Sequence, residues 1–382
     1  MKVAIPKEIQ ENERRVAATP ETVKKMVAAG LSVQVEMGAG EACSIADNIY
    51  QAAGATIASD AKSLLSDADI VLKIQKPLEN KALGANELDL LKPGAILIAF
   101  LQPTLNPDLI ERLVNRKITS FSMDTIPRIA RAQKLDALSS QSNVAGYKAV
   151  LMAANALGKL LPMMMTAAGT IPPGKVLVIG AGVAGLQAIA TAKRLGAVVE
   201  AFDTRPAVKD QVESLGAKFV ELEVAEHETE DKGGYAKELS KESHEKELKL
   251  ISDRAKQADI VITTAQIPGK PAPVLIPEET VKGMKPGSVI VDLAIEGGGN
   301  CALTEAGRDV VKHDVAIIGR LNVPSLMPAQ SSTLYARNIM NLLFEFYKEG
   351  KVNLDPKNEV VSGSLVTQDG KISQPDLQNA VS

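Results

Sequence analysis

The 382-residue sequence has few cysteines and histidines and no surplus of positive charge. Cys43 and Cys301 lie far apart and lack C-x-x-C spacing, so the sequence supports neither a disulfide framework nor a thiolate zinc site. The three histidines, His227, His244 and His313, form no cluster with metal-ligand spacing. The formal net charge of -3 does not favour binding to phosphate backbones. We therefore expect a reducing, cytoplasmic setting, no metal site and no nucleic-acid partner.

Long uninterrupted hydrophobic runs are also missing. The most apolar segment, residues 149–171, contains Asn155, Lys159 and Pro162. A lysine near the centre of a bilayer costs about 2.5 kcal/mol or more, so we predict a buried helix between domains and no direct membrane span. At the amino terminus, no basic region precedes an apolar stretch and a small-residue cleavage site, and we expect a first strand without an export signal.

Short β-rich runs alternate with helical patterns along most of the chain, which predicts βαβ crossovers and parallel sheets. A single hydrophobic core stops growing at roughly 250 to 300 residues, so this length predicts two domains. The expected strands of the first are residues 2–5, 33–36, 70–74, 95–100 and 118–121, and those of the second are 176–179, 198–202, 260–263, 288–293 and 315–318.

Breakers place the domain boundaries. The Ala-, Leu- and Met-rich run 144–161 predicts a helix, and the Gly-Pro-rich segment 169–174 must end any helix. A second helical pattern covers 333–347, whereas the polar stretch from about residue 354 is expected to add little core and to wrap a surface or be partly disordered. We predict an α/β protein of two Rossmann-like, doubly wound parallel-sheet domains joined by long helices. The first comprises 1–140, completed by 327–382, and the second comprises 141–326.

A glycine pattern in the second domain predicts a dinucleotide site. Gly180, Gly182 and Gly185 form Gly-x-Gly-x-x-Gly directly after the strand 176–179 and directly before a helical run. The first glycine permits a tight turn, the second lets the backbone approach a pyrophosphate, and the third allows close packing of helix on strand. The intervening Ala181 and Val183 are counted among the expected nucleotide contacts.

Asp203 strengthens this prediction, because it ends the next strand 18 residues after Gly185, where a carboxylate can accept both ribose hydroxyls. A negative charge there favours NAD(H) over NADP(H), although the neighbouring Arg205 weakens that preference; Thr204 belongs to the same turn. The alternative is a fold of this type that has lost its ligand. Gly38 and Gly40 also follow a strand but lack the third glycine and the acid, so they predict only a turn.

Several motifs together resemble the alanine dehydrogenase and proton-translocating transhydrogenase superfamily over about residues 1–345. They are the runs 14–20, 38–40 and 291–298 and the glycine fingerprint. The run 127–143 closely resembles the NAD(H)-binding component, also called domain I or the alpha subunit, of proton-translocating transhydrogenases. This resemblance implies hydride transfer between NAD(H) here and NADP(H) on a partner subunit.

The resemblance also separates two branches by chemistry. Alanine dehydrogenases hold the substrate carboxylate with an arginine and a lysine and move a proton with a histidine. Arg15 is retained here and their acidic residue falls at Glu296, but the lysine falls at Gln75 and the histidine at Gln102. Gln102 cannot act as a general acid or base, and no histidine precedes His227.

The family match implies specific nicotinamide contacts. Arg128, Asp136 and Ser139 would orient the dihydronicotinamide, catalytic in that positioning sense, with Ile129 beside it and Gln133 at the edge facing the second nucleotide. Without the family match, Arg128 and Asp136 would be interpreted as an ordinary ion pair.

Three further segments are candidates for nucleotide contacts. The charged run 221–249 is either a solvated loop or, as the family implies, a lid with Gly234 and Tyr235 at its tip. Ala265 and Gln266 follow a strand and are expected to contact the adenosine or ribose through their backbone. Asn322 also follows a strand, and either edges the site or belongs to a simple return connection.

The motifs therefore favour the NAD(H)-binding component of a proton-translocating transhydrogenase. The resemblance implies a homodimer, an NADP(H)-binding subunit and a membrane-spanning subunit as partners, and a peripheral position at the cytoplasmic face of the inner membrane. Two alternatives remain: an amino-acid dehydrogenase related to alanine dehydrogenase, and an NADH-binding module without chemistry.

Overall fold

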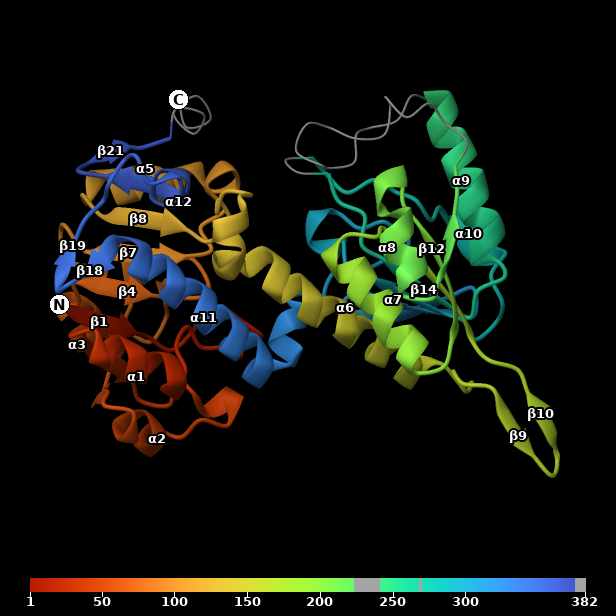
Figure 1. The fold of residues 1–382 in the computed structure, drawn as a ribbon, viewed down its shortest axis with the longest axis horizontal. Helices are drawn as coiled ribbons and strands as arrows, with labels where there is room; N and C mark the ends of the chain where they lie inside the picture. Colours follow the sequence, from red (N-terminus) through yellow and green to blue (C-terminus); the bar gives the residue numbers. More distant parts are fainter. Residues whose placement is uncertain (223–240, 268–269, 375–382) are drawn as a thin grey trace. The chain divides into compact units, whose positions relative to one another are not determined.

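The computed structural model describes residues 1–222, 241–267 and 270–374. The chain divides into two compact units, Met1–Gln141 with Ser325–Ser382, and Ser142–Pro324. Each unit is built around one large, mainly parallel sheet with helices on its faces (Figure 1). The predicted α/β class with two Rossmann-like sheets is thereby confirmed. No described helix is both long enough and apolar enough to cross a membrane.

The sheet of the first unit is doubly wound about β1. The chain runs outward through β2 and β3, returns to the other side of β1 at β4, and continues through β7 and β8, all parallel. In spatial order the strands are β21 (Lys371–Ile372), β20 (Leu365–Gln368), β8 (Thr119–Ser122), β7 (Ile96–Ala99), β4 (Ile70–Leu72), β1 (Lys2–Ile5), β2 (Ser32–Glu36) and β3 (Thr56–Ala58).

Helices cover both faces of this sheet because successive side chains of a strand point to opposite sides. Val3 and Ile5 of β1 join one core cluster, whereas Ala4 joins another. The helices of the unit are α1 (Pro20–Ala28), α2 (Asp47–Ala52), α3 (Ala61–Asp67), α4 (Glu87–Leu90), α5 (Pro107–Asn115), α11 (Pro328–Phe346) and α12 (Glu359–Ser364), with small hairpins at β5 (Glu79–Asn80) and β6 (Ala85–Asn86) and at β18 (Tyr347–Lys348) and β19 (Lys351–Val352).

The sheet of the second unit repeats this winding about β11. Its spatial order is β13 (Lys218–Val220), β12 (Val198–Phe202), β11 (Lys175–Ile179), β14 (Ile260–Thr263), β15 (Val289–Asp292), β17 (Val315–Ile318) and β16 (Asp309–Lys312). Among these described strands, only β16 runs antiparallel to its neighbour. The helices are α7 (Val183–Arg194), α8 (Lys209–Ser214), α9 (Lys241–Ala255) and α10 (Glu278–Lys282), while α6 (Ala137–Ala156) passes in sequence from the first unit into the second.

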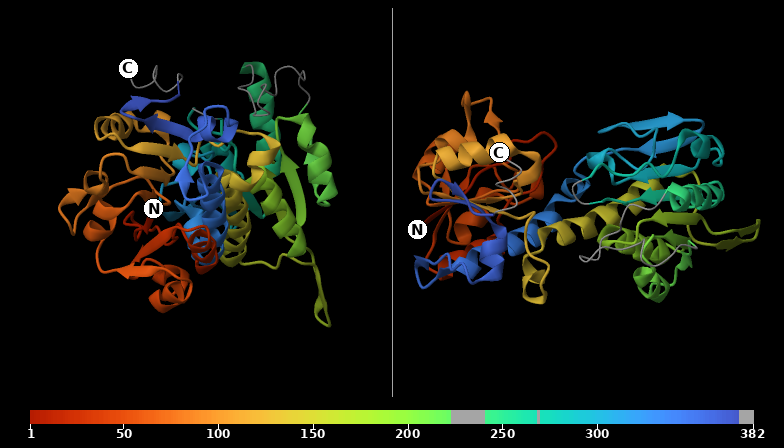
Figure 2. Two further views of the ribbon diagram at one scale, coloured as in Figure 1. Left: turned by 60° about the vertical axis from the view of Figure 1, so that its left-hand side comes forward. Right: turned by 90° about the horizontal axis from the view of Figure 1, so that it is seen from above.

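The prediction of a buried helix across residues 149–171 is wrong in its second half. Helix α6 ends at Ala156, and the chain then forms an exposed hairpin of β9 (Met164–Thr166) and β10 (Gly169–Ile171). Gly158 and Pro162 explain the break, because glycine is a poor helix former and proline lacks the N–H of the helical ladder. The hairpin is visible in Figure 2 as an arm that extends from the second unit.

The prediction that the chain beyond residue 354 adds little core is also wrong. Val360 and Val361 of α12 are buried in the first core, and β20 pairs antiparallel with β8. Within β20, Val366 and Thr367 are fully buried, and the Thr367 hydroxyl donates to the carbonyl of Ile118 at 2.8 Å. This segment therefore completes the first sheet; residues from 375 onward lie outside the described part.

Candidate functional site

The glycine turn follows β11 at the place where the strand order of the second sheet reverses. Gly180 has φ +93°, a conformation open to glycine, and Gly182 caps the start of α7. A Cβ added at Gly182 would meet nothing within 4 Å, so the backbone here faces open space. Helix amino termini leave backbone N–H groups available to anions, and doubly wound folds bind ligands at this reversal. A pyrophosphate fits this turn.

The other glycines of the turn are needed for packing. A Cβ at Gly185 would lie 1.8 Å from the carbonyl oxygen of Gly180, and one at Gly180 would lie 2.6 Å from Oγ1 of Thr264. Gly146 of α6, which the sequence motifs did not single out, would place a Cβ 2.0 Å from the carbonyl oxygen of Ala184. The signal for Gly146 was a single glycine inside an Ala-rich helix.

Asp203 follows β12, as the sequence predicts, and its carboxylate organises the glycine turn. Its Oδ2 accepts the backbone N–H of Ala181 at 2.7 Å. Arg205 donates to the same carboxylate from its backbone N–H, from Nε and from Nη2, each at 2.9 Å. Asp203 is 7% exposed. Nucleotide preference at this position therefore involves Arg205 together with Asp203.

The segment that contains Ala265 and Gln266 follows β14, next to the glycine turn. Ala265 is half-buried and Gln266 is exposed. The buried carboxamide of Asn300 accepts the backbone N–H of Ala265 at 3.0 Å and donates to its carbonyl at 2.9 Å. Asn300 also donates to the carbonyl of Pro273 at 2.7 Å, so one side chain fixes the backbone at Ala265.

Asp292 at the end of β15 is a further residue to which the sequence alone assigned no role. Its carboxylate, 1% exposed, accepts five hydrogen bonds of 2.9–3.1 Å. The donors are the hydroxyls of Thr263 and Thr304 and the backbone N–H groups of Ala294, Asn300 and Cys301. The motif 291–298 contains Asp292, but only the folded chain shows that it holds Asn300 in place.

Asn322 lies in the turn that follows β17. Its φ of +48° is unusual for a residue with a side chain, and asparagine tolerates it better than most. The backbone N–H of Asn322 donates to Oε1 of Glu296 at 2.7 Å. The turns after β15 and β17 are thus connected at the carboxyl edge of the second sheet.

The predicted nicotinamide residues lie in the first unit. Arg128 and Gln133 are exposed, Ile129 is half-buried, and Ala130–Leu135 forms a 3₁₀ helix. Asp136 caps α6: Oδ1 accepts the backbone N–H of Ser139 at 2.9 Å and Oδ2 accepts its hydroxyl at 2.5 Å. Asp136 and Ser139 are therefore adjacent, as the motif predicts, and their bonding is that of a helix amino terminus.

The two tip residues of the predicted lid, Gly234 and Tyr235, lie outside the described residues. The end of the charged run is described, and the prediction of a loop extending to residue 249 is wrong there, because α9 begins at Lys241. Within α9, Glu247 is buried and its Oε2 lies 2.8 Å from Nδ1 of His244.

Charged side chains fill the carboxyl edge of the first sheet. Lys73 is 1% exposed, and its Nζ donates to Glu8 at 3.2 Å and to Glu87 at 2.9 Å. Burial raises the pKa of the Glu8 carboxyl to about 7, although the charge of Lys73 opposes this shift. This edge carries a packed ionic cluster in place of a glycine turn.

Arg15 is part of a second buried pair at this edge. Its Nε and Nη2 donate to the two carboxylate oxygens of Glu13 at 2.8 and 2.6 Å, and its Nη1 donates to Gln141 at 2.9 Å. Burial would raise the pKa of Glu13, but the hydrogen bonds and charge of Arg15 lower it to about 2. The amide of Gln75 donates to Glu13 at 2.8 Å. Arg15 and Gln75 thus both contact Glu13.

Gln102 lies away from this pair in a left-handed turn with φ +47°, and it is exposed. The backbone N–H groups of Leu101 and Gln102 both donate to Oδ2 of Asp124 at 2.8 Å. Among the described residues no group of three His, Cys, Asp or Glu side chains is placed to hold a metal ion.

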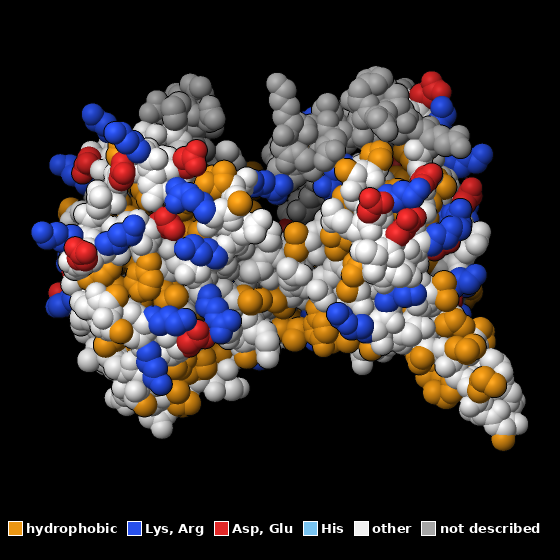
Figure 3. Space-filling view, viewed as in Figure 1, with side chains coloured by type: hydrophobic (Ala, Val, Ile, Leu, Met, Phe, Trp, Pro, Cys, Tyr) orange, Lys and Arg blue, Asp and Glu red, His pale blue; other side chains and the backbone are white. Residues whose placement is uncertain are grey.

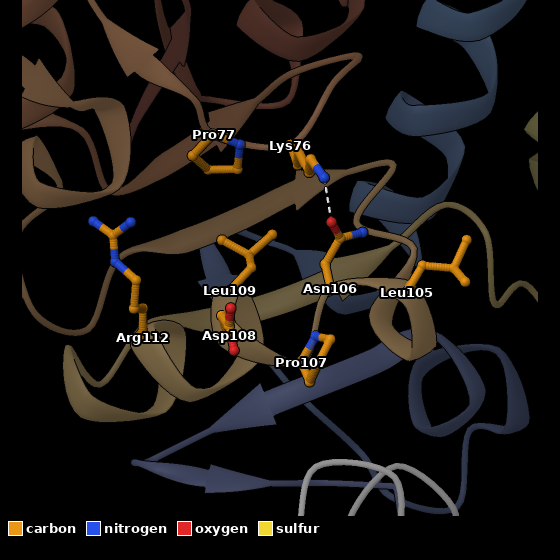
Figure 4. Close-up of a pocket in the computed structure, with 8 residues that line it drawn as sticks. All are labelled: Lys76, Pro77, Leu105, Asn106, Pro107, Asp108, Leu109 and Arg112. Atoms are coloured by element: carbon orange, nitrogen blue, oxygen red, sulfur yellow. Dashed lines mark hydrogen bonds between the residues drawn. The ribbon is translucent and has the colours of Figure 1, made fainter.

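A surface pocket of about 250 Å³ lies elsewhere in the first unit, between Lys76 and the start of α5 (Figure 4). The Lys76 ammonium donates to the side chain of Asn106, and Arg112 pairs with Asp89. Its lining contains none of the residues predicted for nucleotide binding: it is formed by Lys76, Pro77, Leu105, Asn106, Pro107, Asp108, Leu109 and Arg112. We therefore place the candidate site at the glycine turn.

Comparison with known proteins agrees with the motifs. The family model described as "Alanine dehydrogenase/PNT, N-terminal domain" matches residues 4–145, and "Alanine dehydrogenase/PNT, C-terminal domain" matches residues 149–375. The chain is 53% identical over 380 residues to the first of the separate chains named as NAD(P) transhydrogenase subunit alpha in Rhodospirillum rubrum, covering 99% of each. It is 47% identical to "NAD(P) transhydrogenase subunit alpha" of Haemophilus influenzae, covering 98% of this chain and 72% of that protein.

Solved structures give the same result. A transhydrogenase from Sinorhizobium meliloti superposes with a TM-score of 0.84 at 43% identity, covering 98% of this chain and 100% of that one. An L-alanine dehydrogenase gives 0.81 at 26% identity, covering 100% and 99%. The chain therefore belongs to the alanine dehydrogenase/PNT family, and the resemblance to its transhydrogenase branch that the motifs predict is confirmed.

Proposed function

We propose that this chain binds NAD(H) at the glycine turn of its second unit and exchanges a hydride with NADP(H) bound to a partner subunit. The observation that carries the proposal is the open backbone at Gly182, directly before α7 and beside the buried carboxylate of Asp203. The first feature suits a pyrophosphate and the second suits ribose hydroxyls. The names of the transhydrogenase relatives support the reaction.

The chain's own residues bind and orient in this proposal. The turn of Gly180, Ala181, Gly182, Val183 and Gly185 carries the phosphates, with Asp203, Thr204 and Arg205 at the ribose. Asn300 holds the backbone of Ala265 rigid, so that Ala265 and Gln266 present fixed groups to the adenosine. A contact from Asn322 is also part of the proposal.

At the nicotinamide end we propose Arg128, Ile129, Asp136 and Ser139 as contacts, with Gln133 toward the second nucleotide. The support is the family motif, together with the Asp136–Ser139 cap, which fixes both side chains at the start of α6. Hydride passes directly between two nicotinamide C4 atoms, so no acid or base of this chain is required. Orientation to about 3 to 3.5 Å is what the protein must supply.

The partners in this proposal are an NADP(H)-binding subunit and a membrane-spanning subunit that couples the transfer to proton movement. The chain would work at the cytoplasmic face of the inner membrane, held there by these subunits. The support is that the relatives are named as alpha subunits, or segments of them.

We further propose that the chain is a homodimer and that the β9–β10 hairpin contributes to the contact. Its two strands pair only with each other among the described strands. Met163 is 60% exposed and Met165 is 76% exposed. Figure 3 shows the apolar side chains gathered along this arm. Contiguous exposed apolar surface of this kind favours a protein contact. Met165→Lys should shift the chain toward monomer in analytical ultracentrifugation, whereas Val311→Lys on the exposed β16 should not.

The test of the reaction begins with fluorescence titration of NADH and NADPH into the purified chain. An NADP⁺ analogue is then offered with and without the NADP(H)-binding subunit. We expect selective NADH binding and transfer only when the partner is present. Binding without transfer in the full complex would favour a module without chemistry.

The same preparation tests the amino-acid dehydrogenase alternative, which the shared fold and Arg15 favour. The chain alone, given pyruvate, ammonia and NADH, should produce no NAD⁺, because Arg15 and Gln75 both contact Glu13 and Gln102 cannot transfer a proton. Turnover would contradict the proposed reaction.

A further inference from the structure

Asp203 and Arg205 form a closed clasp at the end of β12. The guanidinium donates from Nε to Oδ1 and from Nη2 to Oδ2, both at 2.9 Å, and the backbone N–H of Arg205 adds a third bond to Oδ1. The side chains are 17% and 5% exposed for Arg205 and Asp203. Paired bonds between arginine and carboxylate are among the stronger hydrogen bonds of proteins. The clasp therefore holds Arg205 in one orientation.

A second carboxylate reinforces the negative side of this pair. Glu247 of α9 is 5% exposed, and it lies close enough to Asp203 for the two charges to repel each other. Burial and the charge of Asp203 raise the pKa of Glu247, whereas the bond to His244 lowers it. One arginine thus faces two buried acids, and its charge is already shared.

We infer that Arg205 is a latent binding residue for a ribose 2′-phosphate, which Asp203 keeps closed, so that Asp203 excludes NADP(H) by occupying Arg205 as well as by its own charge. The inference rests on the proposed nucleotide site. It assigns Arg205 a role in choosing between nucleotides that the glycine fingerprint alone does not give.

The chemistry follows from what each ligand would have to displace. An unphosphorylated ribose needs only acceptors for its hydroxyls, which Asp203 supplies while it remains paired. A 2′-phosphate would have to take the guanidinium from Asp203, which would leave that carboxylate unpaired, partly buried and next to another anion. Without the carboxylate, the same guanidinium becomes a free donor pair of the shape that phosphate accepts.

The test compares ADP with adenosine 2′,5′-bisphosphate as competitors of NADH, using NADH fluorescence, in the wild type and in Asp203→Ser and Asp203→Ser/Arg205→Ala. We expect the wild type to prefer ADP. Asp203→Ser should shift the preference toward the 2′-phosphate by about tenfold to a hundredfold, the range of one or two charged hydrogen bonds. The double variant should lose at least about tenfold of that gain.

Two further variants keep the test sharp. Asp203→Asn is nearly isosteric and can still accept the N–H of Ala181, so it should fold and should show a smaller gain that again depends on Arg205. Glu247→Gln removes one negative charge but leaves the clasp intact, and it should shift the preference by less than about threefold.

The inference is overturned if the double variant binds the 2′-phosphate as well as Asp203→Ser does, because Arg205 would then contribute nothing. It is also overturned if Glu247→Gln matches Asp203→Ser, since net charge alone would explain the change. A wild type that binds neither NADH nor ADP would instead refute the proposed function on which the inference rests. Wild-type binding of NADH together with an Arg205-independent result separates the two failures.

Discussion

The two large sheets of this chain share a winding pattern but differ at their carboxyl edges. In the first, the edge beyond β1 and β4 is filled by buried charged side chains, with Lys73 between Glu8 and Glu87 and Arg15 against Glu13. In the second, the edge beyond β11 and β14 has a glycine turn whose middle glycine faces open space. The same topology thus supports an ion cluster in one unit and a candidate ligand site in the other.

The difference indicates where substitutions should act. Charges buried at the first edge are paired, so removing one partner leaves the others without compensation and costs stability. Groups at the second edge are arranged around space, so substitutions there should reach the ligand before they reach the fold. Substitutions at the two edges can therefore break or sharpen this contrast.

Replacing the central cation of the first edge should have the largest effect. Lys73→Met leaves Glu8 and Glu87 buried without their shared partner, and we expect the free energy of unfolding to fall by about 3–5 kcal/mol. Urea unfolding measures it. The control is Lys92→Met, whose pair with Asp69 is partly exposed and should cost at most about 1 kcal/mol. Equal losses in the two variants would contradict the contrast between buried and exposed pairs.

The pH dependence of stability should also reflect the first edge. Glu8 keeps its proton up to about pH 7 in the folded chain but loses it near 4.5 when unfolded. Between these values the folded chain binds more protons, so the contribution of Glu8 falls as pH rises from about 4.5 to about 7, and then levels off. The change would amount to about 3 kcal/mol at most.

The measurement is urea unfolding of the wild type and Glu8→Gln at several pH values. Glutamine mimics the protonated carboxyl, so the stability of the variant relative to the wild type should increase over this pH window. Glu13 has the opposite sign: its stabilising contribution is present above about pH 4.5 and is lost as pH falls toward about 2. A relative stability of Glu8→Gln that does not vary with pH would show that Glu8 does not titrate in this window.

Two glycines of the second edge should separate folding from binding. Gly185→Ala places a Cβ 1.8 Å from the Gly180 carbonyl oxygen, and we expect a stability loss of about 1–3 kcal/mol. Gly182→Ala places its Cβ in open space, so it should unfold like the wild type but weaken NADH binding at least about tenfold. Unchanged NADH affinity in Gly182→Ala would place the pyrophosphate elsewhere.

The smallest expected effect concerns Asn300. Asn300→Ala frees the backbone of Ala265, and we expect ADP affinity to fall by about twofold to tenfold, with a modest loss of stability from unpaired backbone groups. Thr304→Val is the control, because it removes one donor to Asp292 without touching Ala265. If both variants reduce ADP affinity equally, the effect comes from Asp292 and its loop as a whole.

Local pattern was sufficient to predict most of the fold. The predicted strands at 2–5, 198–202 and 260–263 match β1, β12 and β14, because hydrophobic runs bounded by turn residues carry their own signal. The glycine turn and Asp203 were also predicted from the sequence, since each depends on residues within one βαβ unit. The short strands β3, β13 and β16 were missed; each spans only three or four residues.

Contacts between distant residues required the folded chain. The pairing of β20 with β8, the bonds from Asn300 to Ala265 and the five donors around Asp292 join segments that no local pattern relates. The hairpin after α6 was also predicted as helix, because an apolar run does not state whether it will be buried.

The sequence by itself determined the family, the winding of two parallel sheets and the place of the dinucleotide fingerprint, because hydrophobic periodicity and glycine spacing act over short stretches of chain. Only the tertiary structure decided that the tail completes the first sheet, that Lys73 and Arg15 are buried against carboxylates, and that Arg205 closes on Asp203. These features depend on which side chains burial brings together, and desolvation gives a charge a large energetic consequence only after its neighbours are in place.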